Sequence, residues 1–138
     1  MHIVQRHNPT TIWPVPSAFQ HIYSHAAEIS GPARLLFVSG QIGIDPKGDL
    51  SDHFAEQCNQ AMANVEAILE SAGLSQNDLL RVTYYLTNKD HLAELNKIRE
   101  KRWATSDPPA VTTLVVEALA NDDLLVEIEV IAGRQSDG

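Results

Sequence analysis

Two glutamates near the end of the chain, Glu127 and Glu129, are the sharpest candidates for chemistry in the sequence. They stand two residues apart in a run of β-branched residues, so in a strand both carboxylates project from one face of the sheet. Carboxylates on a half-buried face repel each other, and burial raises a carboxyl pKa, so one can stay protonated and act as an acid. The alternative, which spacing alone favours, is pairing with arginine or lysine across a subunit interface.

A second candidate segment precedes these glutamates and runs from Pro108 to Thr113. The residue before a proline is pushed out of the α region, so the two prolines end a helix. The β-branched run from Val111 to Val116 then favours a strand. Farther upstream, Ser39 stands directly before Gly40. No catalytic-triad pattern accompanies this serine, so we interpret the pair as a strand end where backbone approaches a ligand or another chain, with the hydroxyl free to hydrogen-bond it.

The remaining reactive side chains give weaker signals. His21, Tyr23 and His25 share one face if their segment is extended, but no third metal ligand follows at a recognisable spacing. The sequence therefore favours surface or interface histidines, and it predicts no metal and no cofactor. The lone Cys58 excludes an internal disulfide and, on an apolar helix stripe, is expected to be a small core residue.

A long helix and a strand are the clearest elements of the middle of the chain. Apolar residues recur at spacings of three and four after a loop at 45–49, which predicts a helix capped by Ser51 or Asp52 and ended by Gly73. The helix stripe contains Phe54, Cys58, Ala61, Met62, Val65, Ile68, Leu69 and Ala72. Residues 80–86 alternate, so one of Tyr84 and Tyr85 is expected in the core and the other at a cleft.

The other elements complete an α+β order. Residues 22–29 and 35–38, around the turn at Gly31, suggest a hairpin that opens the sheet. A second helix is expected from about Asp90 to Trp103, burying Leu92, Leu95, Trp103 and either Ile98 or the stem of Arg99. The order β-β-α-β-α-β-β gives a sheet with both helices on one face. Leu125 and Ile131 leave the other face half apolar, which implies a partner, most simply further copies of the chain.

Length and charge bound the possible functions. The 138 residues allow one domain, 1–138, with an irregular segment at 1–20 and a tail at 134–138. A net charge of -8 argues against nucleic acid or an anionic membrane as partner. The apolar runs are too short to cross a bilayer, no secretory signal is evident, and a single cysteine fits a reducing compartment, so the cytoplasm is the expected location.

Several segments together resemble the Rid family, also called YjgF-like or L-PSP endoribonuclease-like. They are Tyr23–Ala26, Phe37–Pro46, Gln57–Gly73, Val82–Thr87, Asn96, Pro108–Ala110 and Leu125–Ala132, in the family's order. The resemblance implies the chorismate-mutase-like (YjgF-like) α+β fold and a homotrimer with a small-molecule cleft between adjacent subunits.

The resemblance also implies roles for individual residues. Glu127 corresponds to the catalytic glutamate that positions or activates water, and Tyr23, Ser39 and Gly40 to residues that line the cleft. In imine-hydrolysing members an arginine stands where this chain has Val111, and its planar fork binds the substrate carboxylate. None of the arginines elsewhere in the sequence stands at a spacing that promises a replacement, although one from a neighbouring subunit is a further alternative.

Two main functions follow from this pattern. The first is an imine or enamine deaminase-type hydrolase whose substrate is not a typical 2-imino acid, because valine cannot bind an anion. The second is a small-ligand-binding or regulatory module that keeps the trimer and its clefts without catalysis. An endoribonuclease is disfavoured by the acidic charge and by the lack of a His/Lys catalytic set.

Overall fold

A computed structural model describes residues 4–136 of the chain. The strands are β1 (Val4–His7), β2 (Ala26–Ile29), β3 (Ala33–Ile42), β4 (Leu79–Leu86), β5 (Ala110–Val115) and β6 (Val126–Gln135). The α-helices are α1 (Phe54–Ser71) and α2 (Leu92–Trp103), and short 3-10 turns occupy Ser17–Phe19, Gln76–Asp78 and Lys89–His91. The α+β class expected from the sequence is confirmed.

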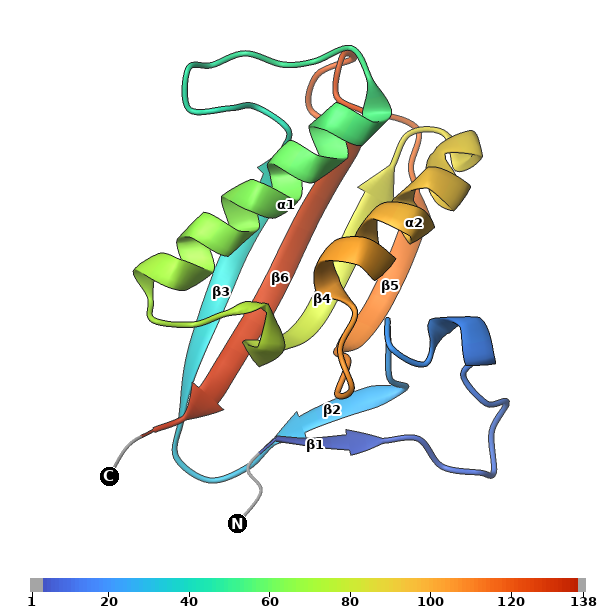
Figure 1. The fold of residues 1–138 in the computed structure, drawn as a ribbon, viewed down its shortest axis with the longest axis vertical. Helices are drawn as coiled ribbons and strands as arrows, with labels where there is room; N and C mark the ends of the chain where they lie inside the picture. The colour runs from blue at the N-terminus through green and yellow to red at the C-terminus, as the bar shows by residue number, and fades with distance from the viewer. Residues whose placement is uncertain (1–3, 137–138) are drawn as a thin grey trace.

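The main sheet has the strand order β3-β6-β4-β5. Only β4 and β5 run parallel, because α2 connects them as a crossover, and the other neighbouring pairs are antiparallel. Both helices lie on the same face of this sheet, as Figure 1 shows. The opposite face, which we call the outer face, has no helix over it within residues 4–136.

The first hairpin differs from the sequence prediction. Strand β2 pairs with β1 in a separate two-stranded sheet, so the predicted pairing of residues 22–29 with β3 was wrong. The segment expected to be irregular supplies that partner strand, and Arg6 of β1 donates a hydrogen bond from Nη2 to the carbonyl of Asp107, 2.8 Å away. This bond fastens the small sheet to the loop before β5. The expected tail also begins inside β6, while residues 1–3 and 137–138 of the two terminal segments lie outside the described residues.

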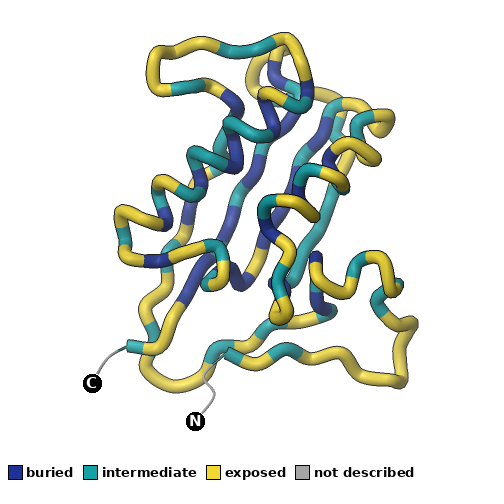
Figure 2. Tube along the Cα trace, viewed as in Figure 1, coloured by how far each residue is buried: buried dark blue, intermediate teal, exposed yellow. Residues whose placement is uncertain are grey.

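Helix α1 buries the predicted apolar stripe against β3 and β6. Its N-cap is His53 rather than Ser51 or Asp52, although the Ser51 hydroxyl accepts a hydrogen bond from the His53 amide at 3.0 Å. Gly73 follows the helix with a φ of +73°, as a residue past a helix end often does. Figure 2 shows the buried positions on the inward sides of both helices and along β4 and β6.

Helix α2 turns Leu95, Arg99 and Trp103 inward, three positions spaced by four. Leu92 is 39% exposed at the start of the helix, so its predicted burial was wrong. Leu125, which was expected on the outer face, packs against the core instead. None of the helices within residues 4–136 is long and apolar enough to cross a lipid bilayer.

Candidate functional site

Glu127 and Glu129 share the outer face, as their spacing predicts. Burial alternates along β6, with Val126, Ile128 and Val130 in the core and the two glutamates half-buried on the other side. Tyr85 of β4 donates a hydrogen bond from its hydroxyl to Glu129. That bond, together with the negative potential of both carboxylates, raises the pKa of Tyr85. No ion pair within residues 4–136 involves either glutamate.

A β-bulge brings Ser39 and Gly40 to these glutamates. The pairing of β3 with β6 shifts register between Val38 and Gln41, which leaves one extra residue on β3. A Cβ placed on Gly40 would lie 1.8 Å from Oε2 of Glu127, so only glycine leaves room for this carboxylate. Ser39, Gly40, Tyr85, Glu127 and Glu129 form what we call the outer-face cluster.

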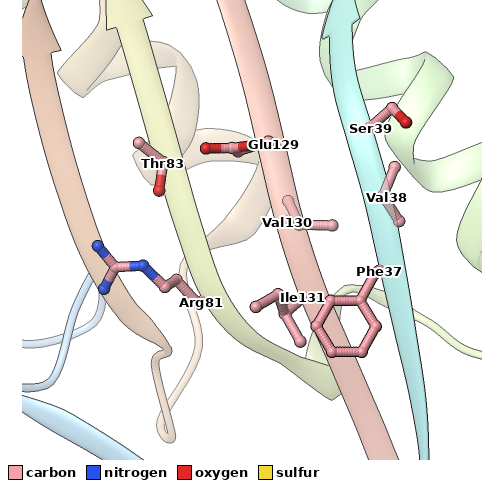
Figure 3. Close-up of a pocket in the computed structure, with 8 residues that line it drawn as sticks. All are labelled: Phe37, Val38, Ser39, Arg81, Thr83, Glu129, Val130 and Ile131. Atoms are coloured by element: carbon pink, nitrogen blue, oxygen red, sulfur yellow. The ribbon is translucent and has the colours of Figure 1, made fainter.

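A shallow pocket of about 310 Å³ adjoins the outer-face cluster. Figure 3 shows its lining side chains, which come from β3, β4 and β6, with Ser39 and Glu129 toward one end and Phe37 and Ile131 toward the other. Arg81 lies on its β5 side and donates a hydrogen bond to the Thr112 hydroxyl at 2.8 Å. The site residues predicted from the sequence did not include Arg81 or Thr83, although both lie on the same face of β4 as Tyr85 according to the alternation.

The outer face carries apolar side chains that one chain leaves uncovered. Phe37 is 71% exposed and Leu35 is 50% exposed, both on β3. Leu114, opposite Tyr85 on the edge strand β5, is 45% exposed. These exposed apolar residues all lie on the same face of the sheet.

Tyr23 and Val111, the other two predicted site residues, lie elsewhere. Val111 is opposite Val82 on β4 and packs against the core, so it faces the helices. Ser24, next to Tyr23, donates its amide to the carbonyl of Pro109 at 2.8 Å, which holds Tyr23 beside the start of β5. Tyr23 also lines a pocket of about 310 Å³ formed with the loop 8–20.

Arg99 is the residue that sequence reasoning undervalued. Its side chain, 6% exposed, reaches from α2 to β5 and donates a hydrogen bond from Nη1 to the Thr113 hydroxyl at 3.3 Å. The signal was available, because the stripe Leu95, Arg99 and Trp103 puts this arginine on the buried side of its helix. We call Tyr23, Arg99, Val111 and Thr113 the edge cluster.

The two clusters do not meet within one chain. Glu127 is level with Tyr85 and Leu114, whereas Val111 is level with Val82 and Val130, three residue steps farther down the sheet. Three steps correspond to about 10 Å, and the two sets of side chains point to opposite faces. A single ligand that touched both Glu127 and Val111 would need the clusters of two different chains.

The remaining reactive groups have structural partners. Residues 21–25 do not form a strand, and the ring nitrogens of His21 and His25 donate to the carbonyls of Thr105 and Trp13, at 3.2 Å and 2.8 Å. No group of three potential metal ligands occurs within residues 4–136. Cys58 is fully buried, as predicted, and burial raises the pKa of its thiol to about 12.

Comparisons with known proteins agree with this architecture. Residues 16–133 match the family model described as Endoribonuclease L-PSP. A RutC family protein of Aquifex aeolicus is 43% identical over 113 residues, covering 80% of this chain and 86% of that protein. A 2-iminobutanoate/2-iminopropanoate deaminase of Salmonella typhimurium is 33% identical over 104 residues, covering 73% and 80%. The solved structure of the Rid family protein YyfB of Yersinia pestis aligns with a TM-score of 0.81 at 30% identity, covering 95% and 98% of the two chains.

Proposed function

The chain belongs to the Endoribonuclease L-PSP family, which includes the Rid proteins, and from that premise we propose that it hydrolyses a small imine or enamine. The observation that carries the proposal is the placement of Glu127 over Gly40. Because Gly40 has no side chain, the Glu127 carboxylate lies against the backbone of β3, next to Ser39 and Glu129, which line a pocket of about 310 Å³. The relative from Salmonella typhimurium, which is named for this reaction, adds support.

The proposed reaction requires only a base and a held water molecule. Glu127 accepts a proton as the water oxygen bonds to the imine carbon, and the C=N electron pair moves to nitrogen, which takes up a proton. Glu127 then returns its proton to the nitrogen, the C–N bond breaks with its electron pair leaving on nitrogen as ammonia, and the hydroxyl loses its proton to Glu127 as the C=O bond of the carbonyl product forms. The Ser39 hydroxyl is positioned to hydrogen-bond the ligand. An enamine enters the same sequence after tautomerising to the imine.

The proposed site lies between subunits of a homotrimer. Two observations support this assembly: the outer face exposes Phe37, Leu35 and Leu114, and the outer-face and edge clusters of one chain point away from each other. Pairing the outer-face cluster of one subunit with the edge cluster of its neighbour builds a cleft with Glu127 and Tyr23 on opposite walls. Light scattering coupled to gel filtration tests this assembly, and a monomer would refute it.

One observation favours a second candidate, a ligand-binding module without catalysis. Val111 leaves β5 without the guanidinium that would hold a substrate carboxylate, so recognition of a 2-imino acid cannot proceed from that strand. The two candidates differ in whether a bound ligand is turned over. RNA cleavage, which the family description also names, is disfavoured because a chain with net charge -8 attracts no polyanion.

The test of hydrolysis is ammonia release from enzymatically generated 2-aminoacrylate/2-iminopropanoate. Removing the base by Glu127→Gln, which keeps the side chain's size, should reduce the rate on the order of 100- to 10,000-fold, as loss of general base catalysis does. Glu117→Gln removes the same charge at an exposed position outside both clusters and should leave the rate unchanged. A wild-type protein that releases no ammonia above background would favour the binding module.

A further inference from the structure

Arg99 is a buried cation without an anionic partner. Its side chain is 6% exposed, and none of the ion pairs within residues 4–136 includes it. Its Nε atom is buried and donates to no acceptor in the described part of the chain. A guanidinium stays charged at any physiological pH, and a buried charge without a counterion is costly.

The protein partners of Arg99 are hydroxyl groups and aromatic rings. Its guanidinium carbon lies 5.8 Å from the ring centroid of Phe19 and 5.3 Å from that of Tyr84. Such contacts are attractive and offset part of the desolvation. They do not use the in-plane N–H donors, which are the groups that match a carboxylate.

This guanidinium lies on the side of β5 that Val111 faces. Residues two apart on a strand share a face, so Thr113, to which Arg99 donates at 3.3 Å, projects on the same side as Val111. Tyr23 adds a second polar wall, close enough to influence the ionisation of Arg99. Tyr23, Val111 and Thr113, the other members of the edge cluster, are each partly exposed.

We propose that Arg99 binds the carboxylate of the substrate, supplying from α2 the cation that Val111 does not supply from β5. This inference rests on the proposed function and extends it, because it makes the substrate a small carboxylate-bearing imine. The carboxylate lies between Arg99 and Tyr23 on one subunit, and Glu127 acts from the neighbouring subunit. Arg99 is therefore a substrate-binding residue that determines specificity.

The test measures binding rather than turnover. Pyruvate, the product of 2-iminopropanoate hydrolysis, is titrated into the wild-type protein by calorimetry, with methyl pyruvate as the uncharged analogue. We expect pyruvate to bind and methyl pyruvate to bind at least tenfold more weakly. Equal binding of the two compounds, or binding of neither, would overturn the assignment.

Variants at three positions locate the contact. Arg99→Gln should weaken pyruvate binding on the order of ten- to a hundredfold, which is what loss of charge-assisted hydrogen bonds costs. Lys101→Gln removes the same charge from an exposed position of the same helix and should change nothing. The double variant Arg99→Gln/Val111→Arg should recover binding, because residues 99 and 111 belong to the same edge cluster and an arginine at either position can bind the carboxylate there. Unchanged affinity in Arg99→Gln would refute the proposal.

Two further comparisons keep the test decisive. If Arg99→Gln does not fold, Arg99→Lys keeps the charge but loses the planar fork, and it should still bind at least several-fold more weakly. Unchanged affinity in Arg99→Lys would then count against the proposal. Arg99-dependent binding without ammonia release would refute the hydrolase proposal and support the anion site. Ammonia release at the same rate in the wild type and Arg99→Gln would support the hydrolase and refute the assignment of Arg99.

Discussion

Replacing Gly40 by alanine is the most direct way to move the Glu127 carboxylate without removing it. The added Cβ would lie 1.8 Å from Oε2, 2.7 Å from Cδ and 2.9 Å from Cγ of Glu127. Contacts of a Cβ under 3.0 Å essentially never occur, so Oε2 must move by at least 3.0 − 1.8 = 1.2 Å. The side chain can swing away toward solvent because Glu127 is only half-buried.

The structural change predicts a large loss of activity and a modest loss of stability. A displacement of about 1 Å in a catalytic group costs on the order of 100-fold in rate. Overpacking at a site that can relax costs about 1–3 kcal/mol in the free energy of unfolding. We therefore expect Gly40→Ala to fold, to unfold at a lower urea concentration, and to release ammonia about 100-fold more slowly than the wild type.

A double-mutant cycle separates this explanation from a general defect. Urea unfolding is measured for Gly40→Ala, Glu127→Ala and the double variant, and the interaction free energy between the two sites is calculated. Without the Glu127 side chain the new methyl meets nothing at 1.8 Å, so the stability cost of Gly40→Ala should largely vanish. Gly133→Ala is the matched control, because its Cβ meets the flexible ends of Leu80 and Leu35 at 2.8 Å and 2.9 Å on the same sheet. An equal cost with and without Glu127 would refute the reasoning.

Two other predictions concern the core. Gln57 is fully buried, donating to the carbonyls of Ser51 and Asp123 at 2.8 Å and 2.9 Å and accepting from the Leu125 amide at 2.9 Å. Gln57→Leu leaves these backbone groups unpaired and should cost on the order of 3 kcal/mol in urea unfolding; Gln60→Leu, a partly buried change on the same helix, should cost under about 1 kcal/mol. Burial raises the pKa of the Cys58 thiol from 9.0 to about 12, so the folded protein keeps a proton that the unfolded chain loses. The corresponding stability is complete below pH 9 and falls as the pH rises toward 12. Unfolding free energies measured between pH 8 and 11 should therefore decline less steeply in Cys58→Ala than in the wild type, and parallel curves would contradict this origin.

The sequence predicted best where periodicity is strong and local. The three-and-four spacing of α1, the alternation of β4 and the two-residue spacing of Glu127 and Glu129 each fix which side chains share a face. The structure confirms these patterns except at the start of β4, where a register shift places Leu79 rather than Leu80 in the core. The sequence-based prediction was wrong where a short segment could pair with more than one strand. Residues 22–29 carry a strand-like pattern but no information about which strand they pair with, and β1 provides the partner instead of β3.

The amino-acid sequence by itself determined the α+β class, the family resemblance, and the set of site residues that lacks an arginine at Val111. Those depend on residue identity and on spacings within one element. Only the tertiary structure decided which of these residues come together. It placed Glu127 against Gly40 through a bulge, put Val111 on the opposite face, and carried Arg99 of α2 to Thr113 of β5. These contacts join residues far apart in the chain, and their distances follow from strand register and helix packing rather than from local sequence.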